Sequence, residues 1–159
     1  MQNSIDLSFG DGLYTFALPV PQIEELQRKT STGIGRLFAR VLKGCTRIGE
    51  DVVLAPHAGE FYVLDLVETL RHGLIGGNHG VVNGTEIQVS PTLADRLIVA
   101  YVLTRPLADS WSLAASVLIA TVVGYEPQDK KKDGSDPKPK RTKTRKAGST
   151  TAESSPTVQ

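Results

Sequence analysis

The residues of this chain with the greatest chemical potential are three histidines and a single cysteine. His57, His72, His79 and Cys45 carry imidazole or thiol groups, which bind metals and transfer protons in many proteins. Their spacing matches neither Cys-x-x-Cys nor His-Glu-x-x-His, the patterns that place such ligands around one ion. We therefore expect the histidines at surface or loop positions, with no metal site and no cofactor.

The glycines and serines do not form a catalytic or nucleotide-binding motif either. Gly33-Ile34-Gly35 is followed by Phe38, where a dinucleotide-binding turn needs a third glycine. No serine lies in a Gly-x-Ser-x-Gly turn, and Glu24-Glu25 is typical of solvated helix charges. The residues predict a protein that is not an enzyme.

The clearest structural pattern is the segment 64–78, which predicts an amphipathic helix over about residues 60–74. Its inward face consists of Leu66, Val67, Leu70 and Leu74. Glu68 and Arg71 are expected on the opposite, solvent-facing side. Gly76 and Gly77 are expected to end the helix, because glycine adopts the left-handed backbone conformation without strain.

Four more helices and two hairpins are predicted around this segment. Alternating apolar residues about Gly10-Asp11-Gly12 indicate an N-terminal hairpin, and Asn83-Gly84 indicates a second one over 81–89. The remaining predictions are a helix of about three turns from Pro21, and helices over 34–42, over 91–105 and from 107 onward. The segment 45–58 is expected to be a loop that could hold one strand. The fold class is α+β and mostly α.

Composition divides the 159 residues into a globular domain, 1–125, and a tail, 126–159. The first part holds 9 basic and 12 acidic residues, whereas the tail holds 9 basic and 5 acidic ones. The tail lacks aromatic residues and is rich in Lys, Pro, Ser and Thr, so it buries too little apolar surface to offset its ordering entropy. We expect the tail to be disordered.

The basic residues of the tail are candidate nucleic-acid contacts. They are Lys130, Lys131, Lys132, Lys138, Lys140, Arg141, Lys143, Arg145 and Lys146. Clustered cations neutralise phosphates in a sequence-independent, salt-sensitive way. A flexible, solubilising extension is the competing interpretation.

The chain shows no membrane or export signal. Its longest uncharged stretch, 110–125, has 16 residues, fewer than the roughly 20 needed to span a bilayer. No charged-then-apolar leader opens the sequence, and one cysteine cannot form an internal disulfide. We expect a protein of the cytoplasm.

Several segments occur in the order typical of one known family. They are Gly12–Leu18, Glu24–Leu26, Leu37–Gly44, Val67–Gly77, Tyr101–Leu107 and Gly124-Tyr125. Over about residues 8–127 the chain resembles the gene transfer agent family of phage tail tube proteins, which are encoded in phage-like particles and prophages. The most specific piece contains Arg71, Gly73, Gly76 and Gly77, which the resemblance marks as structural.

The resemblance implies a role in building a phage-like tail, in a bacterial cytoplasm or within the particle. Common tube subunits are β-sandwich protomers, whereas helical content is more typical of tail assembly chaperones. We therefore expect a morphogenesis protein that contacts the tube subunit and the tape-measure protein. The alternatives are a structural tube subunit and a small nucleic-acid-binding adaptor that uses the tail, and the oligomeric state stays open.

Overall fold

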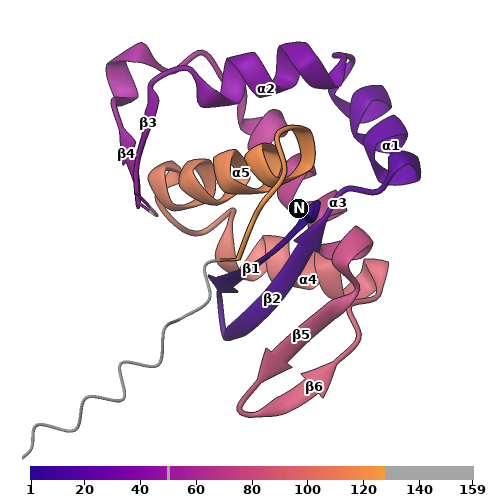
Figure 1. Cartoon of the computed structure of the whole chain (residues 1–159). Helices are drawn as coiled ribbons and strands as arrows, with labels where there is room; N and C mark the ends of the chain where they lie inside the picture. The colour runs from indigo at the N-terminus through magenta and orange to yellow at the C-terminus, as the bar shows by residue number, and fades with distance from the viewer. Residues whose placement is uncertain (50, 128–159) are drawn as a thin grey trace, which may run out of the picture. The chain divides into compact units, whose positions relative to one another are not determined.

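Five α-helices and two antiparallel sheets make up the part of the chain that the computed structural model describes, residues 1–49 and 51–127 (Figure 1). In chain order the elements are β1 (Ser4–Phe9), β2 (Gly12–Ala17), α1 (Val20–Thr30), α2 (Ile34–Leu42), β3 (Cys45–Ile48), β4 (Asp51–Leu54), the 3-10 turn η1 (Pro56–Ala58), α3 (Val63–Gly77), β5 (His79–Val82), β6 (Thr85–Ile87), α4 (Pro91–Tyr101) and α5 (Leu107–Val122). The predicted α+β class with mostly helical content is confirmed.

The larger sheet has the strand order β1-β2-β5-β6, and every neighbouring pair is antiparallel. One row across it joins Leu7, Tyr14, Gly80 and Ile87. The two turns use left-handed backbone conformations, with φ of 59° at Gly10, 50° at Asn83 and 76° at Gly84. Both predicted hairpins are confirmed, because the turn chemistry that specifies them is local.

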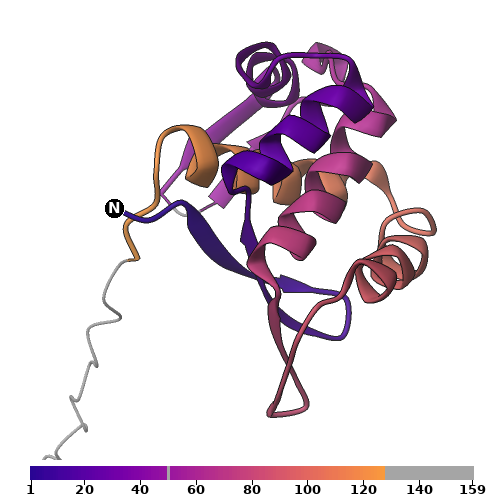
Figure 2. The same ribbon diagram turned by 90° about the vertical axis from the view of Figure 1, so that its right-hand side faces the viewer.

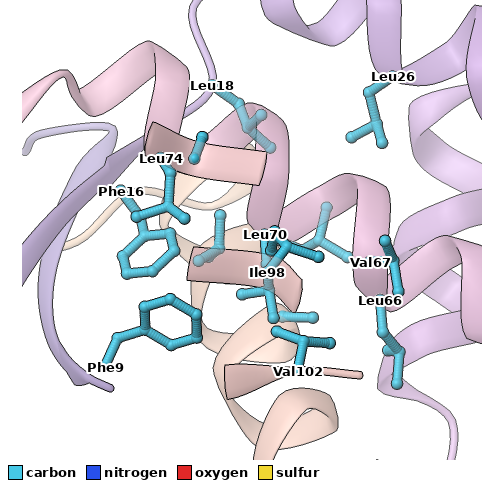
Figure 3. Close-up of a cluster of buried hydrophobic side chains, with 14 of the residues drawn as sticks. Phe9, Phe16, Leu18, Leu26, Leu66, Val67, Leu70, Leu74, Ile98 and Val102 are labelled. Atoms are coloured by element: carbon cyan, nitrogen blue, oxygen red, sulfur yellow. The ribbon is translucent and has the colours of Figure 1, made fainter. Parts of the chain in front are cut away.

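Helix α3 lies at the centre of the described fold. Strand β2 and helices α1, α4 and α5 all pack against it (Figures 1 and 2). The predicted inward face is confirmed, since Leu66, Leu70 and Leu74 are all completely buried. Figure 3 shows Leu70 and Leu74 among side chains from β2 and α4, including Phe16 and Ile98. Helix α3 therefore contacts the other four α-helices and strand β2, and it contributes Leu66, Val67, Leu70 and Leu74 to the core.

Helix α5 is largely buried, because apolar residues occupy most of its surface. Ala114 and Leu118 are fully buried, and Trp111 is almost so. The Trp111 indole Nε1 donates a hydrogen bond of 2.6 Å to the carbonyl oxygen of Val41, which ties α5 to α2. The ring of Phe61 lies 4.6 Å from that of Trp111, measured between centroids.

The segment 45–58 is more regular than predicted. It contains both strands of the small sheet, β3 and β4, and the turn η1, where one strand was expected. Strand β3 could not be predicted from periodicity, because its sequence Cys-Thr-Arg-Ile does not alternate clearly between apolar and polar residues. Its residues are half-buried or exposed. Pairing with β4 is what makes it a strand.

Two helix boundaries also differ from the prediction. Helix α3 begins at Val63 instead of Glu60, because the Asp65 carboxylate accepts a 2.8 Å hydrogen bond from the Tyr62 backbone N–H and so caps the first turn. Helix α4 ends at Tyr101 instead of Arg105, where Leu103 N–H bonds back to the Ile98 carbonyl. The predicted tail lies outside the described residues from position 128 onward, and the proposed domain boundary at 125/126 stays a prediction.

Candidate functional site

The glycines of the family-typical segment form the face of α3 that meets strand β2. A Cβ atom added to Gly77 would lie 1.8 Å from the Thr15 carbonyl oxygen, and one added to Gly76 would lie 2.1 Å from the Ala17 carbonyl oxygen. A Cβ at Gly73 would lie 3.0 Å from the Phe16 ring. These glycines allow the helix and strand backbones to approach closely.

The prediction that Gly76 and Gly77 supply the left-handed conformation that ends the helix is wrong. Helix α3 does end at Gly77, but the left-handed residue that follows it is Asn78, with φ of 47°. Glycine is needed at both positions because strand β2 lies too close to the helix to leave room for a side chain. A turn does not require it. This close packing is consistent with the structural role that the resemblance implies for these residues, which stays a prediction.

Arg71 joins α3 to α4 through Asp95, and it also pairs with Glu68 of its own helix. Its Nη1 pairs with the Glu68 Oε1, and its Nε lies 2.7 Å from the Asp95 Oδ1. The predicted outward orientation is wrong for Glu68, whose side chain is 6% exposed, and only partly right for Arg71, whose side chain is 27% exposed. Helix α3 has neighbours on most sides, so its polar residues are covered as well.

His72 is the main error among the predicted site residues, because it is buried instead of lying on the surface. Its Nδ1 is 2.9 Å from the Gln22 Oε1 on α1, and its Nε2 is 3.3 Å from the Glu68 Oε2. Burial lowers the pKa of the imidazole below its usual 6.5, while the charges of Glu68 and Glu25 oppose this shift and Arg71 reinforces it. The neutral ring is therefore favoured at neutral pH.

Together these side chains line a surface hollow between α1, α3 and α4. It is lined by Lys29, Glu68, Arg71, His72, Asp95 and Val99. A carboxylate beside an imidazole is a common arrangement in acid–base catalysis. Here, however, Arg71 occupies one oxygen of Glu68 and Gln22 contacts the other ring nitrogen of His72. The contacts link three helices to one another.

A second polar link fixes the start of α3. Asp65 is 1% exposed, and Arg40 of α2 donates to both of its carboxylate oxygens, over 2.9 Å and 2.5 Å. The Arg40 guanidinium also lies over the Tyr62 ring, 4.9 Å from its centroid. The sequence gives no periodic signal for this pair, which is 25 residues apart.

The remaining candidate residues are not brought into one site. His79 lies on β5 with its Nδ1 3.3 Å from the Thr15 Oγ1, and His57 lies exposed on η1. Cys45 is half-buried on β3, where burial raises the pKa of its thiol. Within residues 1–49 and 51–127, no group of three or more potential ligands is arranged to hold a metal ion. The basic tail residues, Lys130 to Lys146, lie outside the described part.

The open edges of the larger sheet were not recognised in the sequence. Strand β1 pairs with β2 alone and β6 with β5 alone, apart from one bridge between Gln2 and Tyr125 within the described residues. A groove beside β1 is lined by Ile5, Asp6 and Leu7 of that strand, by Arg47 and Val52 of the β3–β4 hairpin, and by Ile119 of α5. Edge position depends on strand order, which only the fold reveals.

This architecture defines a helix-rich α+β domain whose polar clusters serve contacts between its own elements. More narrowly, the chain belongs to the family described as phage tail tube protein, GTA-gp10, whose model matches residues 2–124. The resemblance to the gene transfer agent family is thereby confirmed, and with it the connection to a phage-like tail. Comparisons with curated proteins and with solved structures gave no match. In the described part, no helix has both the length and the apolar character needed to cross a membrane.

Proposed function

We propose that this protein is a non-enzymatic assembly factor of a phage-like tail, which acts through protein–protein contacts while the tail tube is built. Membership of the tail tube family over residues 2–124 supports the connection to the tail. The observation that favours an assembly role is the helical core, in which the larger sheet packs on α3.

This packing differs from the β-sandwich of common tube subunits. A sandwich builds its core between two sheets that face each other. Here the inner face of the larger sheet presents Tyr14 and Phe16 to a helix-based core, and the second sheet is a single hairpin, β3–β4. A protein whose walls are mostly helices is better suited to binding tail components than to lining a tube of that type.

Exposed apolar side chains provide surfaces for such contacts. Val99, Leu103 and Leu107, near the α4–α5 connection, are 56%, 58% and 40% exposed. Tyr62, at the start of α3, is 66% exposed. A contiguous exposed apolar patch marks a surface that binds partners, and we propose that the residues near the α4–α5 connection form such a patch. We propose the tube subunit and the tape-measure protein as partners, in the bacterial cytoplasm.

The experiment is to delete the gene in cells that produce the particles, complement it, and quantify the protein in purified particles by mass spectrometry. We expect that deletion abolishes tailed particles, that complementation restores them, and that the protein is nearly absent from finished particles. Copies in the same amount as tube subunits would overturn the assembly-factor proposal in favour of a structural tube subunit. Normal tails after deletion would overturn both.

A structural tube subunit is the second candidate, favoured by the family's description and by the two open edges of one sheet. In that case the protein resides in the particle, and the measured copy number distinguishes the two roles.

A further inference from the structure

Basic side chains of the globular part are concentrated in one segment of the chain, residues 26–49. This segment has six basic residues and no acidic one, whereas the remainder of residues 1–125 has three basic and twelve acidic ones. The six are Arg28, Lys29, Arg36, Arg40, Lys43 and Arg47. The small net charge of the chain therefore conceals a strong separation of charge, and the local distribution sets the potential that a charged ligand meets.

This segment forms the last part of α1, all of α2 and strand β3, which follow one another along the top of the molecule in Figure 1. The start of α2 is tied to α1, because the Ile34 backbone N–H donates a 2.8 Å hydrogen bond to the Gln27 Oε1. All of the six basic residues except Arg40 are exposed. We call the surface that these five exposed residues form the basic face.

Helix α2 presents its cations on an open surface. Arg36 and Lys43 are seven residues apart, which places them on the same side of the helix. The small residues Gly35 and Ala39 are exposed near Arg36, so a large ligand can approach the helix closely. The first turn of α2 has no acidic residue, and the positive end of its helix dipole therefore adds to the potential of Arg36. These features favour a ligand with several negative charges.

Two residues of the basic face form ion pairs that an anionic ligand can replace. Arg28 pairs with Glu25, and the two side chains are 70% and 40% exposed. Lys43 pairs with Glu60, and their side chains are 54% and 57% exposed. Ion pairs this exposed contribute little to stability, so a phosphate group can take the place of either carboxylate at small cost.

Two further cations are not used by the fold. Within residues 1–49 and 51–127, Lys29 and Arg36 take part in no ion pair. Arg40 differs from them, because it is held by the almost completely buried Asp65 and so has a structural role. The charges of Lys29 and Arg36 are therefore available to a ligand.

The composition of this region indicates which polyanion fits best. Among residues 21–47, all of which the structure describes, no large apolar side chain is exposed, whereas the centre of a protein interface is usually apolar. The one aromatic residue of the segment, Phe38, is half-buried, so no ring is offered on which the bases of a single strand could stack. Dispersed cations without apolar or aromatic neighbours suit the phosphates of a duplex.

We propose that the basic face binds double-stranded DNA through its phosphates. Contacts with phosphates position a protein on the duplex and carry no sequence information, so binding is independent of sequence and sensitive to salt. This site lies in the globular part and is separate from the cations of the tail. The inference goes beyond the assembly role and does not rest on it.

The test is fluorescence anisotropy of a labelled duplex of about 20 base pairs, titrated with the full-length protein between about 50 and 200 mM salt. All variants keep the tail, so its contribution is the same in each. Arg36→Glu and Arg28→Glu should each weaken binding about three- to tenfold at the lowest salt concentration. Each should also lower the slope of log affinity against log salt concentration by about one, because one phosphate contact is lost.

Arg96→Glu is the matched control, an exposed charge reversal on α4 with the same change in net charge. It should leave the affinity within about twofold of the wild type, because salt screens charges more than about 10 Å from the bound phosphates. Far-UV circular dichroism should show that each variant is folded.

Three competing ligands complete the test. A duplex of scrambled sequence should bind equally well, whereas a single strand of the same length and polyglutamate should bind more weakly than the duplex. Absence of duplex binding, or equal effects of Arg36→Glu and Arg96→Glu, would overturn the proposal. Tighter binding of polyglutamate would also overturn it and would assign the basic face to an acidic protein partner. None of these results bears on the deletion experiment, which tests the assembly role.

Discussion

At the scale of single residues, the family-typical segment combines packing and buried polarity. Gly73, Gly76 and Gly77 bring α3 onto β2, while Arg71 and His72 of the same helix contact α4 and α1. The C-terminal half of α3 therefore contacts β2, α4 and α1 through different faces. Substitutions here test packing and electrostatics separately.

Gly77→Ala should destabilise the protein by about 2–3 kcal/mol or more, because the new methyl group would meet the Thr15 carbonyl and force the backbones apart. Urea denaturation followed by circular dichroism measures the free energy of unfolding. Gly35→Ala on α2 is the matched control, since a Cβ added there would have no atom within 4 Å and alanine favours helix by about 0.5–1 kcal/mol. Equal effects of the two substitutions would contradict the close approach of α3 and β2.

His72 should make the protein less stable in mild acid. Its pKa is lowered in the folded state, chiefly by burial, so the unfolded chain binds the proton more readily. The stability contributed by the neutral ring is present above about pH 6.5 and is lost as the pH falls through the lower pKa of the folded state. The free energy of unfolding of the wild type should fall more steeply between neutral and mildly acidic pH than that of His72→Gln.

His57→Gln, at an exposed position, is the control for that measurement. It should retain the wild-type slope. A wild-type slope equal to that of His72→Gln would show that the buried imidazole does not control the acid sensitivity.

At the scale of elements, buried polar links fix how the helices join. The pair of Arg40 and Asp65 connects α2 to the first turn of α3, and the Trp111 indole connects α5 to α2. These links act between segments that the hydrophobic pattern alone does not orient. Their loss should therefore cost more than the loss of a surface ion pair.

Arg40→Ala should destabilise the protein by about 3 kcal/mol, because the almost completely buried Asp65 carboxylate would lose its cation. Arg28→Ala removes an exposed partner of Glu25, whose pair is largely in solvent, and should change the free energy of unfolding by about 0.5 kcal/mol or less. Chemical denaturation of both variants checks the difference. Similar small losses would mean that Asp65 is held by its contact with the Tyr62 N–H alone.

At the scale of the whole molecule, the composition predicts a globular part followed by a basic tail. A chain truncated after residue 127 should keep the wild-type free energy of unfolding within about 0.5 kcal/mol, since the described part already has a core of its own and the tail sequence has no aromatic residue. Thermal and urea unfolding of both forms measures this. A large loss of stability would show that the tail contributes to the fold and would overturn the predicted domain boundary.

Binding of the full-length and truncated chains to DNA, at low and moderate salt, tests the nucleic-acid alternative for the tail. Salt-sensitive binding that disappears with the tail would support the alternative. Equal binding by both forms would remove the tail as its source.

Local patterns determined much of this fold in advance. The inward face of α3, the Asn83-Gly84 turn and the Ser90-Pro91 helix start were all predictable, because periodicity, turn chemistry and capping act over a few residues. The resemblance of motifs along residues 8–127 also identified the family without the fold.

Only the tertiary structure showed which of these residues are buried and which neighbours they contact. Gly76 and Gly77 have the chemistry of a helix stop, yet a neighbouring strand uses them for close approach. His72 and Glu68 look solvent-facing in the sequence, but α1 and α4 cover the polar side of their helix. Which strands form the edges of the sheet depends on pairings between residues far apart in the chain, such as Thr15 with His79. Sequence patterns report each segment's own periodicity, whereas burial and edge position depend on which distant segments pack beside it.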